Sequence, residues 1–193
     1  EKRGIEYDVL CEEGTPAKEM IRQSRFADLL IADAEICFNE NYEGRPTAFE
    51  REILKKAECP VIIAPEHFNR IDEIIFSYDG SRSAIYAMKQ LDYIFPELRW
   101  TKIILLEVAK VSDSCLTEME QIKEWLCRRY DNINIEILHG KTKNVLYQYL
   151  LQKDNAIFVM GAYGRSALSR LFKRTAAEKV LKTTSLPIFI AHP

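Results

Sequence analysis

The sequence lacks the long apolar run that a membrane-spanning helix needs. No stretch of it approaches the roughly 18 consecutive apolar residues that cross a bilayer. No signal peptide is recognisable either, so nothing points to export. The chain is 47% hydrophobic and 29% charged, which is typical of a globular protein. We therefore predict a protein that works in the cytoplasm without a membrane partner.

Cysteine and histidine are too few and too scattered for a disulfide framework or a metal centre. The five cysteines are odd in number and form no CxxC pair, which favours a reducing cytoplasm. The three histidines have no partner at metal-ligand spacing. Common catalytic motifs are missing as well, with no GxxxxGK[ST] loop, GxSxG elbow or HExxH helix. The sequence favours a non-enzyme, and slow ATP hydrolysis stays open as an alternative.

Charge is distributed unevenly along the chain. Residues 1–66 carry 9 basic and 15 acidic side chains, a net charge of −6, whereas the remainder carries 18 and 14, a net charge of +4. The positive excess is modest, and aromatic side chains are not interleaved with it. Both facts argue against general nucleic-acid binding.

One stretch combines a short apolar run, two glycines and a basic segment. Residues 157–160 are typical of a buried strand, and Gly161 and Gly164 then let the backbone turn tightly or approach a ligand. A strand that leads through such a loop to a helix N-terminus is how α/β proteins hold phosphate. The segment from Gly161 to Lys182 contains six Lys or Arg residues and a single acidic residue, Glu178. This chemistry suits an anion, and a plain strand-to-helix turn is the simpler alternative.

Short apolar strands alternate with amphipathic helices along the rest of the chain. After residue 70 we predict strands at 74–76, 103–108, 133–137, 157–160 and 188–190, with helices between them. Before residue 66, Ile5, Tyr7 and Val9 alternate like a strand, and two further strands are expected at 29–31 and 61–64. This order favours an α/β fold, an open parallel sheet with helices on both faces.

Two parts of the chain repeat each other. Residues 59–64 match residues 186–191 at an offset of 127, while Gly14 and Asp28 match Gly140 and Asp154 at an offset of 126. We interpret residues 1–66 as the C-terminal half of a first domain and residues 70–193 as a complete second domain. The first domain is therefore expected to lack its leading half.

Taken together, these features resemble the universal stress protein family. The family's phosphate loop spaces three glycines before a Ser or Thr, and Gly161, Gly164 and Thr175 fall on that spacing. The first strand predicted after residue 70 leads into Asp79-Gly80-Ser81. The last predicted strand lies in the segment Leu-Pro-Ile-Phe-Ile, as in family members. The resemblance implies a Rossmann-like, adenine nucleotide alpha hydrolase-like fold, with five parallel strands in the order 3-2-1-4-5.

The same resemblance implies an adenine-nucleotide site for ATP or AMP, with Mg, or for a small anion. In nucleotide-binding members, the positions of Asp79 and Val108 hold the adenosine. Independently, Asp79 follows a strand, where open α/β sheets bind ligands. A turn with a helix cap is the simpler interpretation of Asp79-Gly80-Ser81. The candidate binding residues are Asp79, Gly80, Ser81, Val108, Gly161, Gly164, Arg165, Arg174, Thr175 and Ala176.

Arg174 stands where the family has its third glycine. An arginine crowds the loop, and a left-handed conformation there would cost roughly 1 to 2 kcal/mol. Its guanidinium can instead clamp phosphate directly. Of these two effects we favour crowding by the arginine side chain, which leaves the nucleotide site weak or impaired. In the first copy, Asp33 or Ala34 takes the position of Gly161, and an acid there would repel phosphate.

We interpret the chain as a cytoplasmic stress-response protein of regulatory type with a nucleotide crevice in its second domain. The alternatives are a ligand-free interaction or dimerisation module and a slow adenine-nucleotide hydrolase. The family commonly pairs through its last strand, and a sheet edge needs covering. We therefore expect residues 61–64 and 188–191 to pair within one chain as a pseudo-dimer, with a homodimer as a further form of self-association.

Overall fold

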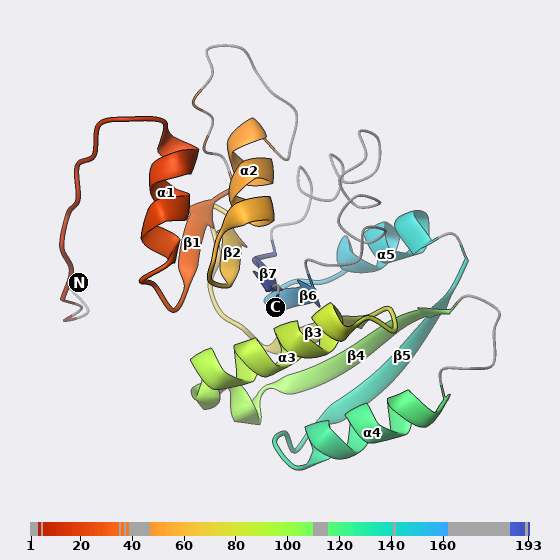
Figure 1. Ribbon diagram of the computed structural model, residues 1–193. Helices are drawn as coiled ribbons and strands as arrows, with labels where there is room; N and C mark the ends of the chain where they lie inside the picture. The colour runs from red at the N-terminus through yellow and green to blue at the C-terminus, as the bar shows by residue number, and fades with distance from the viewer. Residues whose placement is uncertain are drawn as a thin grey trace.

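A seven-stranded sheet runs through the part of the molecule that the structure describes, with helices on both of its faces (Figure 1). This computed structural model describes residues 4, 6–34, 36, 38, 47–109, 116–140, 142–161, 186–191 and 193. For residues 108–109, 116–118 and 142–144 it describes the backbone alone.

The first part of the chain supplies two helices and two strands: α1 (Pro16–Ser24), β1 (Leu30–Asp33), α2 (Ala48–Lys56) and β2 (Val61–Ala64). Proline at the first position of α1 fits a helix start, because its missing N–H would have no partner there. A capping box begins α2: the Thr47 hydroxyl accepts from the Glu50 N–H, and the Glu50 carboxylate accepts from the Thr47 N–H.

The second part alternates strands and helices as predicted. Its elements are β3 (Glu73–Tyr78), α3 (Arg82–Ile94), the 3-10 turn η1 (Pro96–Trp100), β4 (Lys102–Ala109), α4 (Leu116–Cys127), β5 (Ile133–His139), α5 (Thr142–Leu150), β6 (Ala156–Gly161) and β7 (Ile188–Ala191). Pro96 ends α3, because the residue before a proline is disfavoured in helical conformation, and Phe95 is non-helical. The predicted helix around residues 177–181 lies outside the described residues.

The strand order is β1-β2-β7-β6-β3-β4-β5. Strands β3 to β7 therefore follow the order 3-2-1-4-5 expected for the second domain, and their mutual pairings are parallel. The sheet does not stop at five strands, because β2 pairs antiparallel with β7 through Val61↔Ile190, Ile62↔Phe189 and Ile63↔Ile188. The expected contact between the two closing strands is thus present within one chain.

Two apolar clusters cover the two faces of the sheet. One joins α1, α2 and α5 to side chains such as Phe158 and Ile188. The other joins α3 and α4 to alternate side chains of the same strands, such as Val159 and Phe189. Strands β6 and β7 are buried along their whole length, as their continuous apolar runs predict for strands covered on both faces.

The segment predicted as the first strand is not a strand. Residues 6–13 have no regular secondary structure, and Tyr7, Val9 and Leu10 are 80%, 76% and 72% exposed. In the order 3-2-1-4-5 a third strand pairs only with the second, and no described strand pairs with residues 6–13. The prediction of three strands from residues 5–65 is therefore wrong, and the described residues there form two.

Candidate functional site

The predicted crevice lies at the carboxyl ends of β3, β4 and β6. Strand β3 has β4 on one side and β6 on the other, with Tyr78↔Glu107 and Phe76↔Val159 among the pairs. Helices α3 and α4 pack on one face and α5 on the opposite face, so the winding direction reverses between β3 and β6. Ligands of open α/β sheets bind at such a switch point, outside the carboxyl ends of the strands.

A tight turn carries the chain from β3 into α3. The Asp79 carboxylate accepts a hydrogen bond from the Ser81 N–H at 3.1 Å, and Gly80 adopts a φ of +78°, where a side chain would be strained. Ser81 then caps α3 by accepting from the Ala84 N–H at 3.2 Å. The simpler interpretation, a turn and a helix cap, is confirmed. Asp79 and Gly80 nevertheless remain exposed to solvent at the carboxyl end of β3.

Ser83 adds a second hydroxyl beside Ser81 and was not among the predicted binding residues. Its side chain is 2% exposed, and its oxygen lies 3.0 Å from the Ser81 oxygen. The pair of hydroxyls sits in the first turn of α3, where the backbone N–H groups and the helix dipole favour negative charge. Two serines two residues apart at the start of a helix were the signal that the sequence contained.

Gly161 ends β6 against the first turn of α3. A Cβ added there would lie 2.3 Å from the carbonyl carbon of Ser83 and 2.5 Å from the Ala84 nitrogen, both backbone atoms. Any larger residue must therefore push the helix away from the strand. The close approach that requires glycine is made by α3, so this packing explains the residue without a ligand.

Val108 lies near the carboxyl end of β4, at the same end of the sheet as Asp79 and Gly161. Its backbone pairs with Leu138 near the end of β4, one residue beyond the last pair between β3 and β4. The structure thus brings together Asp79, Gly80, Ser81, Gly161 and the backbone of Val108. The other predicted residues, Gly164, Arg165, Arg174, Thr175 and Ala176, lie outside the described residues.

The strand registers identify the counterpart of Gly161 in the first part of the chain. Gly161 pairs with Ala191 of the closing strand β7, and Asp33 pairs with Ala64 of the closing strand β2. Asp33, not Ala34, therefore takes the position of Gly161. Its side chain is exposed. The first part of the chain thus has the acidic Asp33 at the position where the second part has Gly161 packed against α3.

Glu73 is an ionisable residue with a perturbed pKa, and it lies at the opposite end of β3 from Asp79. Glu73, at the amino end of β3, faces Lys102 and Lys153, with a Lys153 Nζ–Glu73 Oε2 distance of 3.0 Å. Burial alone would raise the pKa of Glu73, but the hydrogen bonds from the two lysines outweigh it and lower that pKa. Among the described residues no group of three His, Cys, Asp or Glu side chains is placed to hold a metal ion. In the same part of the chain, every helix is too short or too polar to span a membrane.

Known proteins resemble the chain in sequence and in fold. No protein-family profile matches the sequence. The universal stress protein Slr1230 of Synechocystis sp. (strain ATCC 27184 / PCC 6803 / Kazusa) is 26% identical over 152 residues, which cover 76% of this chain and 51% of that protein. The chain thus spans about half the length of this relative.

Solved structures share the fold at low sequence identity. A universal stress protein from Archaeoglobus fulgidus DSM 4304 superposes with a TM-score of 0.68 at 17% identity, over 92% of this chain and 66% of that one. The hypothetical protein MJ0577 gives a TM-score of 0.52 at 20% identity, over 65% of this chain and 98% of its own. The chain is thus similar in sequence to a universal stress protein, and its strand order and fold are shared with solved structures that include one.

Proposed function

We propose that the chain is a cytoplasmic stress-response protein of regulatory type that holds an adenine nucleotide weakly at the carboxyl ends of β3, β4 and β6. The observation that carries this proposal is the turn at Asp79, Gly80 and Ser81, which lies at the switch point of the sheet and leads into the N-terminus of α3.

The chemistry of the turn suits a nucleoside. One Asp79 oxygen accepts the Ser81 N–H, and the exposed carboxylate has further acceptor capacity for a hydroxyl or amino group. Phosphates would extend toward the segment from Gly161 to Lys182, with its six Lys or Arg residues. Magnesium, which binds largely through water and phosphate oxygens, would arrive with the nucleotide.

The remaining residues of the proposed phosphate cradle are Gly164, Arg165, Arg174, Thr175 and Ala176. In this proposal the backbone from Gly161 onward surrounds the phosphates. Arg174 obstructs that approach, because a side chain replaces the hydrogen of the family's glycine. The site is therefore weak, although its positive charge still attracts anions.

In this proposal residues 1–66 and 70–193 are the two domains of a tandem protein. Support comes from their shared geometry, since each has a helix, a strand and a parallel closing strand in matching register: α1, β1 and β2 in the first, and α5, β6 and β7 in the second. The antiparallel β2–β7 pair would be the pseudo-dimer contact. Because Asp33 puts negative charge at the loop position, the first domain serves packing rather than nucleotide binding.

A ligand-free interaction module is the second candidate. It is favoured by the fact that Gly161 is explained by contact with α3, and that Asp79 and Ser81 already have roles in the turn. A slow adenine-nucleotide hydrolase is the third candidate, and phosphate release under turnover conditions tests it.

Calorimetry with ATP and AMP on the wild type and on Arg174→Gly separates these functions. We expect weak binding by the wild type and binding at least about tenfold tighter in the variant, since the loop regains the backbone approach that a cradle needs. Asp79→Asn in the variant background should weaken binding again, while its amide oxygen can still accept the Ser81 N–H.

Three outcomes would contradict the proposal in different ways. Micromolar binding by the wild type that Arg174→Gly abolishes would mean that the arginine clamps phosphate. No heat and no shift in melting temperature with either chain would favour the ligand-free module. Binding that Asp79→Asn leaves unchanged would place the nucleotide elsewhere.

A further inference from the structure

The hydroxyl group of Ser83 is buried beside the candidate site. Ser83 is only 2% exposed, and the end of β6 packs against it: a Cβ added to Gly161 would lie 2.3 Å from the Ser83 carbonyl carbon. In the part of the chain that the structure describes, the Ser83 hydroxyl has one hydrogen-bond partner, the Ser81 oxygen at 3.0 Å. The Ser83 hydrogen therefore has a single acceptor, and leaving that hydrogen unpaired inside the protein would be costly.

The difference in burial between the two serines decides which hydroxyl donates. If Ser81 donated to Ser83, the buried Ser83 hydrogen would have no acceptor among the described residues. If Ser83 donates, the hydrogen that is left over belongs to Ser81, which is half-buried and reaches solvent. The second arrangement leaves no buried donor unpaired, so it is the more stable of the two.

This direction determines what Ser81 offers to a ligand. A serine oxygen accepts two hydrogen bonds and donates one. The Ser81 oxygen accepts from the Ala84 N–H at 3.2 Å and, in the more stable arrangement, also from Ser83. Both acceptor positions are then filled, and only the Ser81 hydrogen remains available. The neighbouring Asp79 carboxylate is exposed and can only accept.

We propose that Ser83 is a positioning residue of the nucleotide site: it makes the Ser81 hydroxyl a hydrogen-bond donor toward the ligand, next to the acceptor Asp79. This inference rests on the function proposed above. It adds that the turn recognises an acceptor atom and a donor group of the nucleotide together, whereas Asp79 alone would recognise a donor. Ser83 is buried, so it acts through Ser81 and does not touch the ligand itself.

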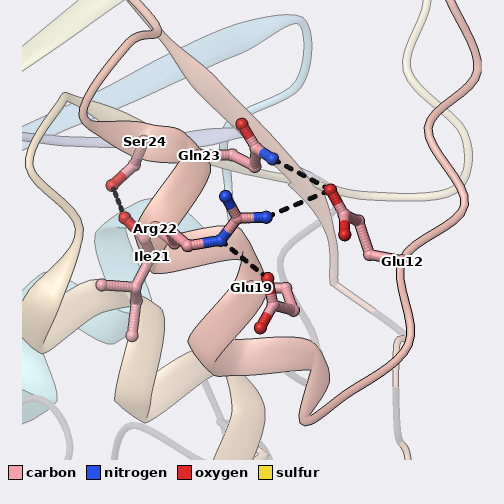
Figure 2. A network of polar contacts seen from close by, with 6 residues as sticks. All are labelled: Glu12, Glu19, Ile21, Arg22, Gln23 and Ser24. Carbon is pink, nitrogen blue, oxygen red and sulfur yellow. Dashed lines mark hydrogen bonds and ion pairs between the residues drawn. The ribbon is translucent and has the colours of Figure 1, made fainter.

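Calorimetry with ATP in the Arg174→Gly background tests this role. Ser83→Ala should weaken ATP binding about threefold to tenfold, because the Ser81 hydroxyl is no longer held as a donor. The matched control is Ser24→Ala on α1. Ser24 is 1% exposed, donates to the Ile21 carbonyl at 2.7 Å (Figure 2) and accepts from the Glu58 N–H at 2.9 Å. The control should lower the melting temperature and leave ATP binding unchanged.

A double-mutant cycle separates positioning from packing. If Ser83 acts through Ser81, Ser83→Ala should change the ATP affinity less than about twofold once residue 81 is also alanine. Two substitutions that weaken ATP binding independently would overturn the proposal. A Ser83→Ala variant with a lower melting temperature and an unchanged ATP affinity would also overturn it, since Ser83 would then contribute only to packing.

The direction of the hydrogen bond is measured without any ligand. In an equal mixture of light and heavy water, a serine hydroxyl whose hydrogen exchanges slowly gives two NMR resonances for its Cβ, one for each isotope. We expect two resonances for Ser83 and one for Ser81, because burial protects only the first hydroxyl. Two resonances for Ser81, or one for Ser83, would overturn the inference even if ATP binds. An Arg174→Gly chain that binds no ATP would instead contradict the proposed function, and the inference with it.

Discussion

Strands β1 and β6 stand in the same register to their closing strands, yet their surroundings differ. β6 is flanked by β3 and ends at Gly161 beneath the first turn of α3. β1 has no described outer neighbour and ends at the exposed Asp33. The comparison shows that the register is set by the strand pair itself. The residue at the strand end depends on what packs over it, because only a helix in contact there requires glycine.

Helix coverage differs between the two regions in the same way. Over β6 and β7 both faces are apolar and covered, whereas the exposed side chains of β1 alternate with buried ones. Ile31 and Asp33 lie on the face opposite α1 and α2, whose cluster contains Leu30 and Ala32. Among the described residues β1 is therefore covered on one face only, although Ile62 of β2 joins the cluster on the other face. The stability of the first region should depend more on local contacts such as helix caps.

The largest effect expected from this comparison comes from placing alanine at the two equivalent strand ends. Gly161→Ala should destabilise the protein by about 3 kcal/mol, because its Cβ overlaps backbone atoms of α3 that cannot rotate away. Asp33→Ala, at the matching exposed position, should cost less than about 1 kcal/mol. Urea unfolding measures both changes. Similar free energies for the two variants would mean that α3 does not rest on β6 as described.

Most of the second region could be predicted from the sequence, because its strands and helices carry strong local signals. The strands predicted at 74–76, 103–108 and 133–137 lie within β3, β4 and β5, and the continuous apolar runs of β6 and β7 marked them as buried. Residues 6–13 were misread as a strand because alternation at Tyr7 and Val9 records only which side chains are apolar. Whether such a segment forms a strand depends on a neighbour, which a local pattern does not contain.

The candidate site was predicted only in part for a related reason. Asp79, Gly80 and Ser81 are next to each other in sequence, and their turn follows from local chemistry. The contact of Gly161 with Ser83 and Ala84 joins segments that are far apart, so the sequence could suggest a close approach without naming its partner. Whether Asp33 or Ala34 matches Gly161 could be decided only from pairing across the sheet.

The helix caps of the two regions provide a second, smaller test. Thr47→Ala should cost about 1.5 kcal/mol, because Thr47 is 4% exposed and belongs to a reciprocal capping box with the buried Glu50. Ser81→Ala should cost about 1 kcal/mol, since Ser81 is half-buried and makes a single cap bond. Chemical denaturation decides the order. A costlier Ser81→Ala would show that the first region does not depend more on its cap.

The smallest expected effect concerns charge, and it compares one acid from each region. Glu73 lies between two lysines and its side chain is 19% exposed, whereas Glu52 on α2 pairs with Lys56 at 2.8 Å and is 32% exposed. In both cases the lysine partners lower the pKa of the carboxyl group. We expect Glu73→Gln to reduce stability by about 1 kcal/mol at neutral pH, and Glu52→Gln to have a smaller effect.

The dependence of this difference on pH follows from the direction of the pKa shift. A carboxyl group whose pKa is lower in the folded state stabilises the protein fully above its unfolded pKa, about 4.5, and loses that contribution as the pH falls through the folded pKa. The stability gap between the wild type and Glu73→Gln should therefore stay constant from neutral pH down to about 5 and close below the folded pKa. Thermal unfolding across this range measures the gap. A gap that persists in acid would mean that the glutamate contributes through packing, and that the charge cluster at the amino end of β3 does not distinguish the second region from the first.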